Sequence, residues 1–336
     1  MTGPVLVLVE HDRGVPAETA YQAFALAQAV ADGLGSPPIE AVLIGEAAAP
    51  LAGDVAARGA QAVRLVRHPD VDDYAPEAWG DALAAAARSA GARAVVAVGT
   101  DRGNEVLAHV AAIEDLPFAA NVTGVEVSDG ACSLTRVRWG GSLLEQGSLE
   151  ASVLILSAAA HAFPAPEPAV DDSAAPDVEE LTPELGPEAA RTRIVERETA
   201  ADAGTSLTGA AVVVSGGRGV GSAEGFAALE ELAGLIGGAV GCSRVVTNNG
   251  WRPHSDQVGQ TGKRIAPELY IACGISGAIQ HWVGMMAAKR VLAINTDRDA
   301  PMVTKADFAV IGDLHVVLPA VIEELRRRRP EGAPAA

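Results

Sequence analysis

Two glycine-rich turns in the second half of the chain lie where they could bind a phosphate group. The turn 274–277 (Gly-Ile-Ser-Gly) follows the apolar run 269–273, and the turn 216–219 (Gly-Gly-Arg-Gly) follows the run 211–215. A helix N-terminus with small residues offers free N–H groups and a partial positive charge, which suit a phosphate or pyrophosphate. The alternative is that the glycines only permit a tight connection from strand to helix, and neither turn is a GxGxxG motif.

Several polar side chains accompany these turns. Arg218 offers a fork of donors for a phosphate oxygen or an acidic group, although a lone Arg in such a loop is as often a solvated surface residue. His281 falls near the first turn of the helix that follows 274–277. Asn295 and Asp313 follow two later apolar runs, and an amide or carboxylate there commonly contacts a ribose or base in doubly wound sheets.

Two polar loops in the same half, 242–244 (Cys-Ser-Arg) and 257–263 (Gln-Val-Gly-Gln-Thr-Gly-Lys), either line a site or simply connect elements. The seven histidines show neither HExxH spacing nor a Ser/His/Asp arrangement, and the three cysteines form no CxxC pair. We therefore expect no catalytic residue and no metal site. Scattered cysteines fit free thiols in a reducing compartment.

The charge balance argues against some classes of partner. The 336 residues include 25 Lys or Arg and 43 Asp or Glu, which gives a formal net charge of −18. Such a chain is repelled by a nucleic-acid backbone and by an anionic membrane surface. The first apolar run, 5–9, ends at Glu10 and indicates a strand rather than a signal peptide. No run approaches the roughly 20 apolar residues that span a bilayer, so we expect a cytoplasmic protein with no nucleic acid and no direct membrane insertion.

The first half alternates β-branched runs with Ala-rich stretches of helical period, which is typical of a parallel sheet flanked by helices. This pattern predicts an N-terminal α/β domain over residues 1–205. We expect strands at 5–9, 39–44, 63–66 and 94–99, helices at 17–34, 47–58, 76–90 and 104–113, and more antiparallel β-segments at 124–127, 133–139 and 152–157.

The segment 164–187 differs in composition from the rest of that domain. It contains six prolines and no Lys or Arg, and with Glu188 it carries eight acids. Such a composition buries too little apolar surface to order itself, so an extended acidic linker is expected at about 164–188. The stretch 192–199 then alternates around Ile194 and Val195, which predicts an edge strand of the first domain. The domain boundary is placed near Ser206.

The second domain, 206–336, repeats a cleaner alternation of strand and helix. We expect strands at 211–215, 269–273, 291–295 and 308–311, and helices at 223–236, from about 278 to 289, and at 319–329. Four strands with short Gly-rich turns predict an open, doubly wound parallel sheet, which binds its ligand at the carboxyl ends of the strands. The basic run 326–329 at a helix end offsets the negative end of the helix dipole.

Longer motifs in this half resemble the α subunit of electron transfer flavoproteins, a FixB-like family. They are LYIACGISGAIQH at 269–281, VLAIN at 291–295, VSGGRG at 214–219, GCSR at 241–244 and QVGQTGK at 257–263, with a weaker likeness at 9–11. The resemblance implies a heterodimer in which the C-terminal domain of this chain holds most of an FAD. The β subunit of the family covers part of the isoalloxazine and binds AMP.

The resemblance also implies which residues contact FAD. They are Arg218, Ser243, Arg244, Val258, Gly259, Gln260, Thr261, Ser276, Gly277, Ala278, Ile279, Gln280, His281, Asn295, Asp313 and Leu314. Within this set, Thr261 would offer its hydroxyl near flavin N5, and His281 would hydrogen-bond near O2. Arg244 would lie over the flavin, where its fixed positive charge favours reduction.

The function that the resemblance implies is that of an electron carrier. FAD would accept electrons from flavoprotein dehydrogenases of the acyl-CoA dehydrogenase type, as in fatty acid oxidation, and pass them toward a quinone-linked oxidoreductase. The chain would turn over no substrate of its own. The alternatives are a specialised or bifurcating relative that serves one dedicated dehydrogenase, a flavin- or nicotinamide-dependent oxidoreductase on the same fold, and a cofactor-free scaffold for the β subunit.

Overall fold

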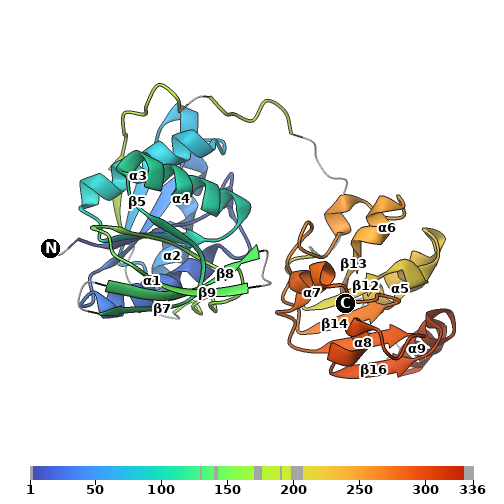
Figure 1. The fold of residues 1–336 in the computed structure, drawn as a ribbon. Coiled ribbons are helices and arrows are strands. Elements are labelled where there is room, and N and C mark those ends of the chain that lie inside the picture. The colour runs from blue at the N-terminus through green and yellow to red at the C-terminus, as the bar shows by residue number, and fades with distance from the viewer. Residues whose placement is uncertain are drawn as a thin grey trace. The chain divides into compact units, whose positions relative to one another are not determined.

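A computed structural model describes residues 3–128, 131–139, 143–169, 176–189, 191–197 and 207–328. The described chain divides into two units, one formed by the residues before 198 and one by residues 207–328 (Figure 1). Each unit is built on a largely or wholly parallel sheet with helices, so the predicted α/β class is confirmed. The expected boundary near Ser206 falls outside the described residues.

The sheet of the first unit has the strand order β11-β5-β4-β1-β6-β10-β7-β8-β9. Its strands are β1 (Val5–Leu8), β4 (Ile39–Ile44), β5 (Ala62–Val66), β6 (Ala94–Val98), β7 (Phe118–Ser128), β8 (Ala131–Arg138), β9 (Leu143–Leu149), β10 (Leu154–Ala158) and β11 (Asp177–Leu181). The central strands β1, β4, β6 and β10 are buried along their whole length. They read as continuous apolar runs because helices cover both faces of a parallel sheet.

Two pairs of helices supply that cover. Residues of α1 (Ala23–Gly33) and α2 (Ala52–Ala57) pack into the core on one face, and those of α3 (Pro76–Ala90) and α4 (Asp101–Glu114) pack into the core on the other. The helix predicted at 104–113 begins three residues earlier, because the Thr100 hydroxyl accepts a hydrogen bond from the Gly103 N–H at 2.8 Å and caps it. The helices predicted at 17–34 and 47–58 are shorter and each is preceded by a 3₁₀ turn, Ala20–Gln22 and Glu46–Leu51.

The last strands of this sheet differ in part from the sequence prediction. β7 and β8 form an antiparallel pair, as expected, and β9 pairs antiparallel with β8, but β10 runs parallel to both β6 and β7. The prediction of an antiparallel segment at 152–157 was therefore wrong. β9 was not predicted, because most of its side chains are exposed and its sequence lacks an apolar alternation.

The acidic, Pro-rich segment contains a strand, so the expectation that all of it stays extended and unordered was wrong. β11 pairs in parallel with β5, residue for residue from Asp177 to Leu181. Basic side chains of β5 and of the residue that follows it face its acids: Arg64 contacts Glu179 at 2.8 Å, and Arg67 contacts Glu180 at 3.0 Å. Backbone pairing and opposite charge thus order a stretch that has little apolar surface.

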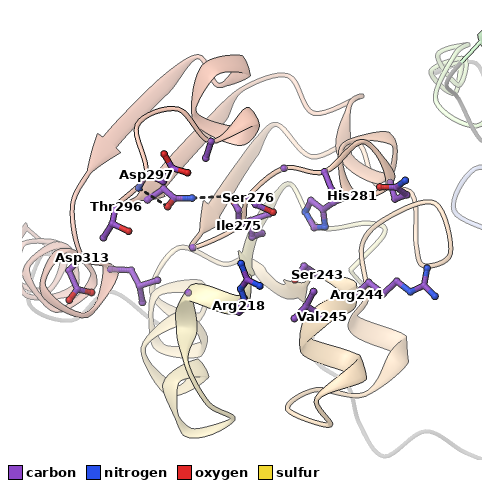
Figure 2. Close-up of a pocket in the computed structure, with 18 of the residues that line it drawn as sticks. Arg218, Ser243, Arg244, Val245, Ile275, Ser276, His281, Thr296, Asp297 and Asp313 are labelled. Atoms are coloured by element: carbon purple, nitrogen blue, oxygen red, sulfur yellow. Dashed lines mark hydrogen bonds between the residues drawn. The ribbon is translucent and has the colours of Figure 1, made fainter.

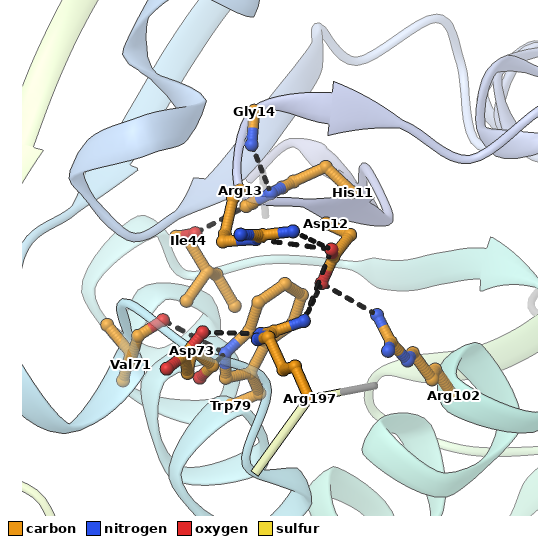
Figure 3. Close-up of polar contacts among 10 residues, drawn as sticks. All are labelled: His11, Asp12, Arg13, Gly14, Ile44, Val71, Asp73, Trp79, Arg102 and Arg197. Atoms are coloured by element: carbon orange, nitrogen blue, oxygen red, sulfur yellow. Dashed lines mark hydrogen bonds and ion pairs between the residues drawn. The ribbon is translucent and has the colours of Figure 1, made fainter. Parts of the chain in front are cut away.

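The edge strand predicted at 192–199 is absent from the described part, residues 191–197. This segment is instead held by side chains (Figure 3). The Arg197 guanidinium donates to Asp12 at 3.1 Å and to Asp73 at 2.5 Å, and Arg102 lies 3.8 Å from the same Asp12 carboxylate. Asp12 belongs to a small hairpin, β2 (His11–Asp12) and β3 (Val15–Pro16), that follows β1. The segment therefore attaches at the carboxyl edge of the first sheet without joining the sheet.

The second unit has a five-stranded, fully parallel sheet in the order β13-β12-β14-β15-β16. Its strands are β12 (Val212–Gly216), β13 (Ala239–Cys242), β14 (Leu269–Cys273), β15 (Val291–Asn295) and β16 (Phe308–Ile311), and its helices are α5 (Ala227–Leu235), α6 (Arg244–Asn248), α7 (Ile279–Met285), α8 (Pro301–Lys305) and α9 (Leu314–Arg328). α5 and α9 pack on one face, while α7 and α8 contribute to the core on the other. The predicted doubly wound sheet is confirmed.

Three details of the second unit were not predicted. β13 is only four residues long and includes a glycine, so its sequence gave a weak strand signal. α6 and α8 are five-residue helices, which are too short to show a helical period in the sequence. α9 begins at Leu314 rather than at residue 319, because the Asp313 carboxylate accepts the His315 N–H at 2.9 Å and starts the helix before Pro319.

The ion pair between Arg64 and Glu40 supports a specific stability prediction. Glu40 is 9% exposed and lies 2.5 Å from Arg64. Arg64→Ala leaves this nearly buried carboxylate unpaired, so we expect the first unit to lose about 2 kcal/mol of unfolding free energy. Hydrogen exchange of the β4 and β5 amides in the full chain measures the loss, and β11 should lose protection as well.

Arg138→Ala is the matched control. Arg138 is 48% exposed and contacts Glu145 at 3.1 Å, so its removal should cost less than about 0.5 kcal/mol. Equal losses for the two variants would contradict the role assigned to Arg64.

Candidate functional site

The order of the strands creates a crevice in the second unit. β13 lies on one side of β12, whereas β14, β15 and β16 lie on the other, so the chain reverses its winding between β12 and β14. In open α/β sheets such a switch point opens a crevice at the carboxyl ends of the two strands. A cavity of about 560 Å³ lies there (Figure 2). It is lined by Arg218, Gly219, Ser243, Arg244, Val245, Asn248, Gly274, Ile275, Ser276, Gly277, Ala278, Gln280, His281, Asn295, Thr296, Asp297, Ala300, Gly312, Asp313 and Leu314.

Close contact between two glycine turns shapes this cavity. The Gly217 N–H donates to the Cys273 carbonyl at 2.9 Å, and the Gly219 N–H donates to the Gly274 carbonyl at 3.1 Å. A Cβ on Gly217 would lie 2.3 Å from the Gly274 oxygen, a distance that no side chain tolerates. The glycines therefore let the turns after β12 and β14 lie against each other. This contact brings Arg218 and Ser276 to one cavity.

The turn after β14 is braced from the neighbouring strand. The Asn295 amide donates to the Ile275 carbonyl at 3.0 Å, and its oxygen accepts the Asp297 N–H at 3.0 Å. The Ser276 carbonyl accepts the Met302 N–H at 3.0 Å. Within the described structure the N–H groups of residues 276–278 donate to no protein acceptor. A fixed turn with free N–H groups on the cavity wall suits an anionic ligand.

The two cations of the cavity are also without protein partners. The guanidinium groups of Arg218 and Arg244 are exposed and form no ion pair or hydrogen bond among the residues that the structure describes. Arg252 in the same unit shows the contrast, because Asp256 and Glu230 both neutralise it. Figure 2 shows Asp297 and Asp313 apart from Arg218 and Arg244. The cavity thus offers cations in one part and carboxylates in another, as a ligand with both phosphates and hydroxyls requires.

His281 is the buried polar side chain of the cavity wall. It is 7% exposed, and its Nε2 lies 2.7 Å from the Tyr270 hydroxyl. Its Nδ1 is buried and makes no hydrogen bond of ordinary geometry among the described residues. Burial lowers the pKa of His281 to about 4, and a weaker interaction with the Val258 backbone acts in the opposite direction. His281 is therefore a neutral imidazole at pH 7.

Five predicted residues do not line the cavity, namely Val258, Gly259, Gln260, Thr261 and Ile279. Four of them form a loop that packs on the start of α7, where the Gln260 N–H donates to the Gln280 carbonyl at 2.7 Å. The Thr261 hydroxyl accepts a hydrogen bond from the Gln257 amide at 3.0 Å, and the Gln257 oxygen accepts one from Thr247 at 2.6 Å. The structure therefore places this loop beside the cavity and ties it to α6.

Some lining residues were missed by the sequence analysis. Val245 and Asn248 lie on α6, a helix that was not predicted. Thr296 and Asp297 follow β15 directly, so the rule that ligands bind beyond the carboxyl ends of strands could have found them beside Asn295. Ala300 and Gly312 contribute small surfaces that no sequence signal marked.

The described residues give little support to a metal site, a reactive cysteine or a membrane-spanning helix. They contain no cluster of three or more His, Cys, Asp or Glu side chains that could hold a metal ion. Cys132, Cys242 and Cys273 are free and buried, and burial raises the pKa of each thiol. No helix in the described part of the chain is long and apolar enough to cross a bilayer.

His11, which falls in the weaker N-terminal likeness, has a different setting from His281. Its Nδ1 accepts the Gly14 N–H at 3.2 Å, so Nε2 carries the proton and donates to the Ile44 carbonyl at 2.8 Å (Figure 3). Its ring also packs against Trp79 with centroids 5.2 Å apart. Both ring nitrogens have partners within the protein, which indicates a structural role.

Fold and site together define a two-unit α/β protein whose second unit has a nucleotide-cofactor type of cavity at its switch point. Comparison with known families gives two matches. Residues 206–286 match the electron transfer flavoprotein FAD-binding domain, and residues 5–185 match the electron transfer flavoprotein domain.

Known relatives are similar to the chain over nearly its whole length. The chain is 36% identical over 325 residues to electron transfer flavoprotein subunit alpha of Mycobacterium leprae, covering 96% of this chain and 98% of that one. It is 33% identical over 325 residues to protein FixB of Clostridium saccharobutylicum, covering 96% of each. A solved decarboxylase from Rhodococcus jostii aligns at 10% identity and a TM-score of 0.24, over 99% of this chain and 61% of that one, which supports no argument. The chain belongs to the electron transfer flavoprotein family, as an α subunit.

The left-handed turn at Gly277 yields the next prediction. Its φ is +83°, and an added Cβ would lie 2.4 Å from the Met302 nitrogen. Gly277→Ala should therefore cost more than the roughly 1 kcal/mol of backbone strain alone. Gly221→Ala is the control, because Gly221 has a φ of +87° but open space around it. Hydrogen exchange of the β14 amides measures both losses, and a smaller loss for Gly277→Ala would contradict the clash.

The burial of His281 predicts how stability depends on pH. Its pKa is about 4 in the folded chain and 6.5 when exposed, so both states carry a neutral ring above pH 6.5. Between pH 6.5 and 4 only the unfolded chain binds the proton, so stability falls as the pH falls, by at most about 1.4 kcal/mol per pH unit.

His281→Gln tests this dependence, since Gln does not titrate. The unfolding free energy of the second unit is obtained from hydrogen exchange of the β14 amides, corrected for intrinsic exchange rates. Between pH 7 and pH 5 it should fall in both proteins, and the fall should be smaller in the variant by up to about 2 kcal/mol. Equal slopes would show that His281 titrates normally.

Proposed function

We propose that FAD binds in the cavity at the switch point of the second sheet and that the chain, paired with a β subunit, carries electrons between other redox proteins. The donors would be flavoprotein dehydrogenases of the acyl-CoA dehydrogenase type, and the acceptor a quinone-linked oxidoreductase. The supporting observation is the composition of the cavity. Free N–H groups, unpaired cations and a neutral buried imidazole converge there, without a nucleophile or a paired acid and base.

The cavity residues fit an FAD in several respects. The free N–H groups of residues 276–278 and the guanidinium of Arg218 would hold the negatively charged pyrophosphate. Asp297 and Asp313 would accept hydrogen bonds from hydroxyl groups. The orphaned Nδ1 of His281 shows that this wall has a buried polar atom without a protein partner.

Bound FAD would supply the capacity to take up and release electrons. The chain's own residues set the surroundings of that exchange. Ser243 and Arg244 lie at the start of α6 on the wall near His281, and a fixed positive charge there stabilises negative charge that develops in the cavity. The loop 258–261 packs beside the start of α7, where it would limit access of water to the ring system.

A carrier role agrees with what the cavity contains. General acid–base catalysis of a proton transfer uses a positioned side chain, ideally with a pKa near the working pH. His281 is neutral and buried, with a pKa of about 4, and Thr261 is engaged by Gln257. We therefore propose that the chain has no substrate turnover of its own. We also propose that the complex is a heterodimer whose AMP lies in the β subunit, outside this chain.

Reconstitution tests the proposed function. The chain is purified with its β subunit and titrated with FAD, and flavin absorbance should remain with the complex after gel filtration. Arg218→Ala removes one charge-assisted contact, so its FAD dissociation constant should rise about tenfold.

Arg290→Ala is a control with the same change in net charge. Arg290 is exposed, lies 3.6 Å from Asp307 and does not line the cavity, so FAD affinity should not change. A complex that retains no flavin overturns the proposal. Steady oxidation of NADH or of a hydroxy acid without an acceptor protein supports an oxidoreductase instead.

A further inference from the structure

We infer that Tyr270 is a positioning residue that holds His281 as a neutral imidazole with its proton on Nδ1. Tyr270 does not line the cavity and was not among the predicted cofactor contacts. It acts through His281, which does line the cavity. The inference concerns the chain's own side chains, and its meaning for a bound flavin rests on the proposed function.

The geometry places the two rings in a fixed contact. Tyr270 lies on β14, the central strand of the second sheet, and is completely buried, and His281 lies on α7, which packs over the same face of the sheet. The Tyr270 hydroxyl is 2.7 Å from His281 Nε2, and the ring centroids are 6.1 Å apart at an angle of 49°. A phenol at this distance makes a strong hydrogen bond to the imidazole.

The direction of this hydrogen bond follows from the charge states. Burial raises the pKa of the Tyr270 phenol, so it keeps its proton, and His281 is neutral. A neutral imidazole has one donor nitrogen and one acceptor nitrogen. If Tyr270 donates to Nε2, the ring proton is on Nδ1.

The burial of the phenol favours that direction. The Tyr270 hydroxyl is fully buried and its hydrogen-bond partner in the described structure is His281 Nε2, and a buried O–H without an acceptor would cost free energy. Ser215 on β12 shares the Tyr270 face of the sheet, because Val213 pairs with Tyr270 and Ser215 with Ala272. The Ser215 Oγ is buried and makes no hydrogen bond of ordinary geometry among the described residues, so the contact of the phenol with His281 is the one that orients its proton.

The arrangement fixes what the cavity wall offers. A ring held at Nε2 has one orientation and one tautomer, so its polarity toward the cavity does not fluctuate. A neutral ring also leaves Arg218 and Arg244 as the charged donors of the wall. With Tyr270 in place, the arginines supply the fixed positive charge of the wall, and His281 supplies a neutral dipole of fixed direction.

Nitrogen NMR of the histidine rings in the full chain tests the inference. Long-range ¹H–¹⁵N spectra distinguish the protonated from the unprotonated ring nitrogen, and His281→Gln assigns the signal. His11 is an internal reference of the opposite kind, because its contacts require the proton on Nε2. At pH 7 we expect His281 to show Nδ1–H and His11 to show Nε2–H.

Tyr270→Phe removes the hydroxyl while keeping the ring. The Nδ1–H signature of His281 should then be lost or averaged between tautomers, while that of His11 stays unchanged. A folded variant that keeps a pure Nδ1–H form overturns the inference. Ser215→Ala is a second variant, for the case that Tyr270→Phe does not fold. It leaves the phenol donor in place, so the Nδ1–H signature of His281 should persist in it.

The wild-type chain alone also decides the question, since an Nε2–H form of His281 overturns the inference. Adding the β subunit and FAD separates this outcome from the fate of the proposed function. Absence of bound flavin with an Nδ1–H ring would remove the proposed function and leave the positioning role intact. Bound flavin with an Nε2–H ring would do the reverse.

Discussion

The backbone contact between the turns after β12 and β14 is the constraint on which the second unit depends. The Gly217 N–H donates to the last carbonyl of β14 at 2.9 Å and the Gly219 N–H donates to the Gly274 carbonyl at 3.1 Å, so neither turn has room for side chains at the contact. Because the strands are parallel and adjacent, this contact falls at the switch point of the sheet. It gathers Arg218, the free N–H groups after β14 and the start of α6 around one cavity. The glycines thus have two effects: they let the two turns pack against each other, and they leave the cavity open.

The buried histidines of the two units differ in their hydrogen-bond partners. His11 has a backbone partner on each nitrogen and packs against Trp79, so its environment is complete within the protein. His281 has a partner for Nε2 but none of ordinary geometry for Nδ1, and burial lowers the pKa of both rings. A buried polar atom without a partner costs free energy. The second unit carries that cost on a cavity wall, where the proposed ligand would lie.

The net charge of −18 is distributed in a way that the total conceals. In the segment 176–189, acids of β11 lie against Arg64 and Arg67, so basic residues of the first unit are neutralised there. In the second unit Arg252 is likewise paired, whereas Arg218 and Arg244 have no partner in the described structure. Ion pairs at a surface contribute little stability individually. Arg218 and Arg244 differ from these residues in having guanidinium groups that are unpaired and line the cavity.

The sequence by itself determined the α/β class, most central strands and the family, because continuous apolar runs and the motif 269–281 are local signals. It also marked Arg218, Ser276 and Asn295, since each stands at or shortly after a strand end, and His281, since it lies in the first turn of the helix that follows a glycine-rich turn. The tertiary structure alone decided how they act. Asn295 uses its amide to brace the turn after β14, and β11 forms where composition argued for disorder, because both depend on partners distant in the sequence. Which ring nitrogen of His281 carries the proton also depends on the tertiary structure. Tyr270, eleven residues earlier and on a different element, contacts the other nitrogen.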